Sequence, residues 1–349
     1  MSVTAVTAAI DDLPGGSFAF VMATGIISID AERQGFRRLA LGLFAISAIA
    51  FVLLAVLTVL RLARKPAVML RELSSHETGA GFLTLVAGTG ILANELVLLS
   101  SFSNLAACLW VAASAIWVLL VYTFSMELAV MPAKPPLEIG LDGSWLLFTV
   151  ASQSLAILGT HVASVFGRAD VVLYLSLCWF LLGGWFYLIV IALILHRWWF
   201  APMSPAQFTM PYWINMGAVA ITTLAGARLD MIAGDVPWLA RLAPAITAVT
   251  VASWAVATWW IPLLLVLTFW RYAIGAVPLR YHLEYWSMVF PLGMYSAATW
   301  AFAQATGFDF LGAIPKFFLW IAFAAWLATF IAMLRSQTFT GDCPSGSAG

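Results

Sequence analysis

The residues of this chain that could perform chemistry on a substrate are few. Among its 349 residues are four histidines and three cysteines. The histidines show neither an HxxxH nor an HExxH spacing, and no two cysteines form a CxxC pair. We therefore expect neither a metal site nor a cofactor, and we do not expect an enzyme. The histidines are His76, His161, His196 and His282, all near the ends of apolar stretches or between them.

One carboxylate stands inside an apolar stretch. Glu95 follows Asn94 within residues 80–101. A carboxylate within the hydrocarbon core of a membrane is costly and is a candidate functional group, so Glu95 could carry a proton or shape the field near one mouth of a pathway. The alternative is that Glu95 lies close enough to the end of its stretch to reach water or a paired neighbour. The residues leave both readings open.

The sharpest local feature is the segment Tyr285-Trp-Ser-Met-Val-Phe-Pro-Leu-Gly-Met-Tyr295. Pro291 lacks an N–H, and its ring clashes with the carbonyl four residues earlier, so a helix through this segment should kink there, where Gly293 adds room. Phe290 stands at this kink. An aromatic side chain in that position could plug an axial pore, although the residues by themselves favour a phenylalanine that packs in a core.

The elements that must position these residues are membrane-spanning helices. Hydrophobic residues make up 63% of the chain and charged residues 9%, against roughly 25% charged residues in soluble proteins. A helix of about 20 apolar residues crosses the hydrocarbon core. Ten stretches reach or approach this length, at residues 14–30, 37–60, 80–101, 103–126, 142–161, 170–197, 208–228, 238–270, 284–304 and 313–335.

These stretches predict one all-helical, polytopic membrane domain over residues 14–335. Residues 1–13 form a cytoplasmic N-terminal segment without the basic residues of a signal peptide, and residues 336–349 form a polar tail that we expect to be disordered. Lysine and arginine number nine on the side of the termini and seven on the other, out of 16. We expect the protein in the cell membrane, that is, the cytoplasmic or inner membrane. The excess of Lys and Arg on the side of the termini favours both termini in the cytoplasm. The formal net charge is zero, which gives no case for nucleic acid as a partner.

The ten stretches alternate in composition. Odd-numbered stretches hold most of the glycine and the small polar residues, and even-numbered stretches hold more of the bulky apolar residues. Small residues let helices approach closely, and polar groups avoid lipid. We therefore expect five helical hairpins, with inner odd helices and outer even helices around a central pore, or else an ordinary bundle packed through its glycines. The candidate pore-lining residues are Thr24, Gly25, Ser28, Thr89, Gly90, Ser152, Asn215, Gly217 and Met294.

Three segments carry a resemblance to a known family. They are residues Phe18–Ile26, Tyr212–Ala218 and Tyr285–Gly293. Together they resemble the tellurite-resistance/dicarboxylate transporter family, which includes plant slow-type anion channels and fungal malate and sulfite transporters. The resemblance covers residues 14–335. One departure is Ala23, where many relatives have glycine.

The resemblance implies five hairpins in a quasi-fivefold arrangement around one pore per subunit, and homotrimers of such subunits. It also implies a phenylalanine on the ninth helix that occludes the pore, and its place before Pro-x-Gly matches Phe290. We expect transport of small inorganic or organic anions, attracted by helix dipoles and by Ser and Thr hydroxyls along a wall nearly free of charge. The alternatives are a proton-coupled C4-dicarboxylate carrier or sulfite exporter that uses Glu95 and, last, a polytopic membrane enzyme.

Overall fold

The computed structural model describes residues 10–339, and within them every regular element is a helix. Residues 1–9 and 340–349, which include most of the predicted N-terminal segment and of the predicted polar tail, lie outside the described part of the chain. The first residues of that predicted tail, 336–339, continue the last helix, so this helix ends later than the apolar pattern indicates.

The long helices fall into two sets that alternate along the chain. The inner helices are α2 (Ala19–Arg33), α5 (Leu83–Ser100), α8 (Leu147–Val162), α10 (Ile214–Ala233) and α13 (Trp286–Thr306). The outer helices are α3 (Arg37–Arg64), α6 (Ser103–Val130), α9 (Ala169–Phe200), α12 (Ala243–Phe269) and α14 (Ala313–Phe339). The short helices α4 (Pro66–Leu73), α7 (Leu137–Gly140) and α11 (Pro237–Ala240) lie in the connections.

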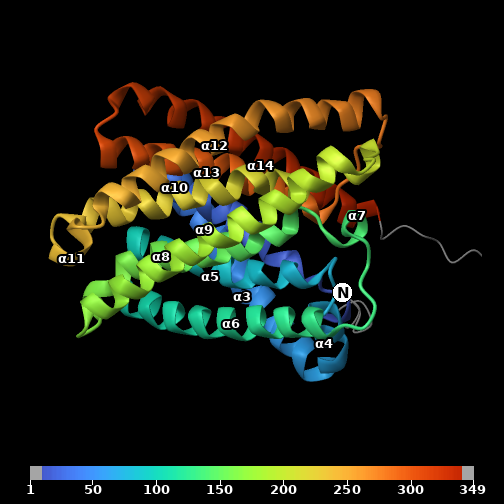
Figure 1. Cartoon of the computed structure of the whole chain (residues 1–349), viewed down its shortest axis with the longest axis horizontal. Coiled ribbons are helices and arrows are strands. Elements are labelled where there is room, and N and C mark those ends of the chain that lie inside the picture. The colour runs from blue at the N-terminus through green and yellow to red at the C-terminus, as the bar shows by residue number, and fades with distance from the viewer. Residues whose placement is uncertain (1–9, 340–349) are drawn as a thin grey trace, which may run out of the picture.

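The inner helices form a closed ring. Each of α2, α5, α8, α10 and α13 contacts the next one in this order, and α13 contacts α2 again. Each inner helix also contacts the outer helix that follows it along the chain, as the long antiparallel rods in Figure 1 illustrate. The described chain begins and ends at the same end of this bundle, where α4 and α7 also lie (Figure 1).

Burial follows the same alternation. In each span, we compared the buried share of its most apolar 18 residues. This share is 94% in the span of α8 and 72% in that of α5, against 11% in α3 and 22% in the span of α14. Small residues make this possible, because a Cβ at Gly90 of α5 would lie only 3.0 Å from Cβ of Ser154 on α8. The outer helices instead expose bulky apolar side chains such as Ile49 and Leu119, as helices facing lipid do.

Eight helices of the described chain are long and apolar enough to cross a membrane, so the chain is a polytopic membrane protein. The eight are the five outer helices together with α5, α8 and α10. The inner helices α2 and α13 are not among them: α2 has only 15 residues, and α13 has 21 residues, several of them polar. The sequence predicted spans at both places.

Candidate functional site

The five inner helices begin at the same end of the bundle. A 3-10 turn precedes each of them, and neighbouring turns contact each other in a second closed ring, at Gly15–Phe18, Gly79–Phe82, Gly143–Leu146, Met210–Trp213 and Leu283–Tyr285. An outer helix returns the chain after each inner one, so the inner helices run parallel. Their N-terminal ends, which carry partial positive charge, therefore meet at one end of the ring and their C-terminal ends at the other.

Two cavities lie along this ring, one at each end of the inner helices. The terminal cavity has a volume of about 630 Å³ and is lined at the helix N-termini by Ala19, Thr84, Leu147, Pro211 and Ser287, one from each inner helix or the turn before it. The far cavity has a volume of about 170 Å³ and is lined towards the helix C-termini by residues of all five inner helices, among them Arg33, Asn94, His161, Leu224 and Met294.

An apolar layer separates the two cavities. On four inner helices, a residue that lines the terminal cavity is followed seven positions later by one that lines the far cavity, and the residue three positions after the first lines neither. The four sets are Ala19, Met22 and Ile26; Thr84, Ala87 and Ile91; Leu147, Val150 and Ser154; and Ser287, Phe290 and Met294. Seven helical residues rise about 10 Å, which is the distance along the helix axis between the backbone positions of the residues that line the two cavities. We call Met22, Ala87, Val150 and Phe290 the central layer.

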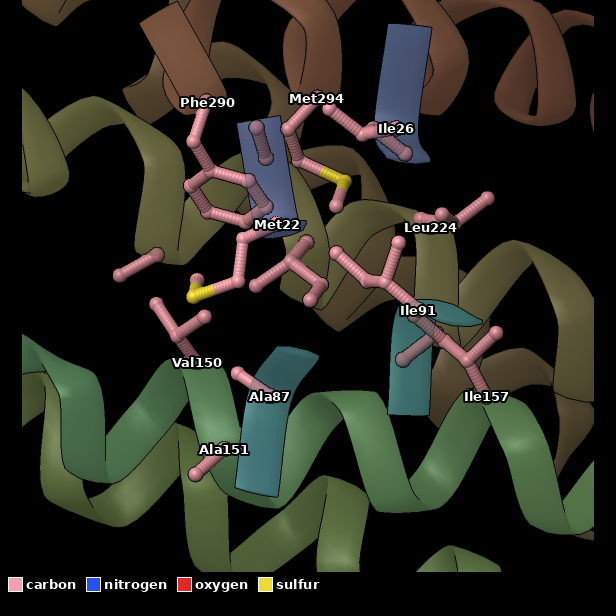
Figure 2. Packing of buried hydrophobic residues seen from close by; sticks show 14 of the residues in the cluster. Met22, Ile26, Ala87, Ile91, Val150, Ala151, Ile157, Leu224, Phe290 and Met294 are labelled. Atoms are coloured by element: carbon pink, nitrogen blue, oxygen red, sulfur yellow. The ribbon is translucent and has the colours of Figure 1, made fainter. Parts of the chain in front are cut away.

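Phe290 is the largest side chain of the central layer and is only 2% exposed. In Figure 2 its ring points from α13 towards the middle of the ring of inner helices, where the side chains of Met22 and Val150 approach it. Pro291, the next residue, lies inside α13 and offers no N–H to the carbonyl of Ser287, which lines the terminal cavity. The aromatic side chain that the sequence singled out therefore lies between the two cavities.

Of the nine predicted pore-lining residues, Met294 lines the far cavity. The hydroxyls are directed elsewhere: Thr24 accepts a hydrogen bond from Nε1 of Trp326 on α14 (2.9 Å), and Ser28 donates to the carbonyl of Ala40 on α3 (2.9 Å). Thr89 and Ser152 donate to carbonyls one turn back in their own helices. The side-chain amide of Asn215 is buried and has no hydrogen-bond partner.

The three predicted glycines lie at contacts between inner helices. A Cβ at Gly25 would lie 2.6 Å from Cγ2 of Ile91, and one at Gly217 would lie 2.7 Å from Cγ of Pro291. Gly90 faces Ser154, as described above. Gly293, predicted to give room at the kink, faces Ile26 and Ile27 of α2 at 3.0 Å. These glycines bring the inner helices together and line neither cavity.

Glu95 lies on the side of α5 that faces α3. Its Oε2 accepts a hydrogen bond from the hydroxyl of Ser47 on α3 (2.8 Å), its Oε1 has no partner, and the side chain is fully buried. Asn94, its neighbour, lines the far cavity, whereas Glu95 lines neither cavity. The candidate proton site is therefore separated from both cavities by helix packing.

The terminal cavity is rich in carboxylates, which are Asp11, Asp12, Glu72, Glu77, Asp142 and Glu284. Arg61 forms a two-bond ion pair with Glu72, at 2.6 and 2.7 Å, and Lys65 pairs with Asp11 at 2.9 Å. The hydrogen bond from Lys65 lowers the pKa of Asp11, whereas desolvation raises the pKa of Asp142 and of Glu284. The positive ends of the inner helices face these carboxylates and offset their charge.

The far cavity carries the opposite charge. Arg33 and His161 line it, and no carboxylate does among the described residues. The expectation of an inner wall nearly free of fixed charge thus fits the central layer but neither of the two cavities. Sequence reasoning placed His161 near the end of an apolar stretch, did not single out Arg33, and missed their convergence. The seven-residue spacing of Ala19, Ile26 and Arg33 puts these residues on one face of α2, but it does not indicate that this face meets His161 of α8.

Comparison with known proteins identifies relatives of the chain over nearly its whole length. The family model SLAC1, described as "voltage-dependent anion channel", matches residues 12–334. An uncharacterized membrane protein of Mycobacterium tuberculosis is 39% identical over 154 residues, which cover 44% of this chain and 78% of that protein. Two uncharacterized transporters of Methanocaldococcus jannaschii are each 22% identical over 93% and 94% of this chain, and 94% of each transporter is covered. The resemblance found from the three sequence segments is confirmed.

Proposed function

Because this chain belongs to the SLAC1 family of voltage-dependent anion channels, we propose that it moves small anions across a membrane along the axis of its inner helices, and that Phe290 closes this path. One observation carries the proposal: Phe290 lies between a cavity at one end of the ring and a cavity at the other. A rotation of its side chain away from the axis would need no movement of the backbone. A path that opens through one rotamer change suits a channel.

The path requires that all five inner helices cross the membrane, including α2 and α13. Helix α2 continues the 3-10 turn Gly15–Phe18, and together they extend about 30 Å, the thickness of the hydrocarbon core. The polar residues of α13 do not oppose a crossing, since Ser296 and Thr299 are fully buried against neighbouring helices and need not face lipid. We therefore infer ten spans arranged as five hairpins.

We place both ends of the chain in the cytoplasm, on the excess of Lys and Arg at that end of the bundle. Single cysteines in a variant without the three native cysteines test this orientation. Ala133→Cys lies in the exposed loop after α6, and Gly234→Cys lies in open space after α10, at the opposite end. In intact cells, a membrane-impermeant thiol reagent should label Gly234→Cys and leave Ala133→Cys unlabelled. The reverse pattern would invert the topology.

The direct test of the path is anion flux through purified protein in lipid vesicles. Phe290→Ala should raise the flux of nitrate or chloride at least about tenfold, the change expected when a barrier falls by about 1.4 kcal/mol. The matched control is Phe302→Ala. Phe302 is a second 2%-exposed phenylalanine of α13, but it stacks on Trp254 of α12 at 5.7 Å, away from the central layer.

Both substitutions remove a buried aromatic ring and should destabilise the protein similarly, by about 3–5 kcal/mol. Only Phe290→Ala should open the path. Equal flux in the wild-type protein and in folded Phe290→Ala would show that Phe290 is not the residue that closes it. Equal increases in both variants would indicate leak through a loosened bundle instead.

A further inference from the structure

Three buried nitrogen atoms at the far end of the inner helices have no hydrogen-bond partner among residues 10–339. They are Nη1 of Arg33, Nε of Arg228 and Nδ1 of His161. Arg33 lies in the last turn of α2, His161 in the last turn of α8, and Arg228 near the end of α10. Three neighbouring groups that each leave a buried nitrogen unpaired are unusual, because buried polar atoms almost always have a partner.

The three groups also act on one another electrostatically. The charges of Arg33 and Arg228 repel each other, and both would repel a third positive charge on His161. Neither arginine forms an ion pair with any described carboxylate. Asp30, the carboxylate that most favours the charge of Arg33, is instead held by Nε2 of Gln34 at 3.1 Å. Two guanidinium groups that are desolvated together, with no carboxylate in ion-pair contact, cost free energy, which a bound anion would recover.

The helix ends do not account for this arrangement by themselves. The cation Arg33 at the C-terminal end of α2 does offset the partial negative charge there. That role explains where the positive charge is, but a helix dipole forms no hydrogen bond with the unpaired Arg33 and Arg228 nitrogens. The guanidinium of Arg33 is also oriented, since it lies over the ring of Trp300 at 5.2 Å. An oriented, unpaired guanidinium beside a cavity is a preformed anion receptor.

We propose that Arg33 and His161, which line the far cavity, bind a small oxyanion there, such as nitrate or a short carboxylate, before it reaches the central layer, and that Arg228, near the end of α10 but not in the cavity lining, adds its positive charge to this site. This inference rests on the proposed function and names the ligand class that the far end selects. An oxyanion fits better than a halide, because a guanidinium donates two parallel N–H groups that match two oxygens. The cavity of about 170 Å³ has room for about five waters at about 30 Å³ each, and thus for an anion of a few heavy atoms.

The test measures binding apart from transport. Purified protein in detergent is titrated with potassium nitrate, potassium acetate or potassium chloride at constant ionic strength, and the rise in unfolding temperature gives an apparent affinity. Wild-type protein should bind nitrate and acetate more tightly than chloride. Arg228→Gln and Arg33→Gln should each lose at least about tenfold in oxyanion affinity, the loss expected when a nearby positive charge is removed at Arg228 and a charge-assisted hydrogen bond at Arg33.

Two further variants sharpen the test. Arg33→Lys keeps the charge but loses the paired donors, so it should bind chloride as the wild-type protein does while its preference for nitrate falls. Arg241→Gln, at an exposed arginine that follows α11 at the same end of the molecule, should change nothing. If a Gln variant does not fold, Arg33→Lys alone still decides the outcome, because it keeps the charge.

Unchanged oxyanion affinity in the folded Arg33 and Arg228 variants would overturn the proposal. So would equal affinity for nitrate and chloride in the wild-type protein. Binding that depends on Arg33 and Arg228, together with no flux even in Phe290→Ala, would keep this inference and reject the proposed pathway. Flux through Phe290→Ala without arginine-dependent binding would do the reverse.

Discussion

Pro291 of α13 lies in the space where Gly217 of α10 has no side chain, with its Cγ 2.7 Å from the position of a Cβ on that glycine. This contact holds α13 against α10 one residue after Phe290. It therefore sets how far the aromatic ring reaches into the axis of the inner helices. The contact between Gly217 and Pro291 thus lies one peptide unit away from Phe290, the residue that we propose closes the path.

Gly217→Ala should push α10 and α13 apart. An added methyl group in a well-packed interior costs about 1–3 kcal/mol, so the unfolding temperature of the purified protein should fall. Gly184→Ala is the matched control, since a Cβ at this glycine of α9 meets nothing within 4 Å. That change should leave the protein unaffected or stabilise it by up to about 1 kcal/mol, because alanine favours helix. Equal destabilisation by both changes would contradict the packing role.

Glu95→Gln should leave anion flux and its dependence on pH unchanged, because the carboxyl contacts Ser47 of α3 and lines neither cavity. Flux into vesicles measured over a range of external pH checks this. Ser47→Ala removes the hydroxyl that Glu95 uses and should lower stability by about 1–3 kcal/mol, since it leaves a buried carboxyl group with one partner fewer. A loss of pH-dependent transport in Glu95→Gln would favour a proton-coupled carrier instead.

Thr24→Val should cost stability without changing flux. The hydroxyl of Thr24 accepts the hydrogen bond of the Trp326 indole at 2.9 Å, and its loss leaves a buried N–H unpaired, at a cost of about 1–3 kcal/mol. Thr58→Val is the control, because that hydroxyl donates its hydrogen bond to the carbonyl of Leu54, one turn back in α3. Thermal unfolding and vesicle flux, measured on the same preparations, separate the two effects. An altered anion flux in Thr24→Val would return Thr24 to the pore wall.

Asp142 should make stability depend on pH. Desolvation raises its pKa in the folded protein above the ordinary value of about 3.9. The folded state then binds the proton more tightly than the unfolded state, so this contribution is complete at low pH and is lost as the pH rises through the raised pKa. Asp142→Asn keeps a side-chain oxygen able to cap Ser144 but cannot titrate.

The unfolding temperature of the wild-type protein, relative to Asp142→Asn, should therefore decline as the pH rises from about 4 and then level off above the raised pKa. Unfolding scans of both proteins in one detergent, over a series of buffers, measure this difference. A difference that grows in favour of the wild-type protein with rising pH would have the wrong sign.

The sequence by itself determined the class of the protein and the order of its helices. Charge at 9% and long apolar stretches leave no alternative to membrane helices, because backbone polar groups in lipid must be satisfied within each segment. The alternation of glycine-rich and bulky stretches predicted which helices are buried, and the motif around Pro291 singled out Phe290. These are local properties, readable from spacing and composition.

The tertiary structure alone decided which faces of the inner helices meet the axis. Thr24, Ser28 and Glu95 have side chains that suit a pore wall, yet they point to outer helices, because the rotation of each helix is set by its contacts with several neighbours at once. The same contacts bring Arg33, His161 and Met294, from three helices, to one cavity. No spacing within a single helix encodes that convergence, since it depends on how the five inner helices close into a ring.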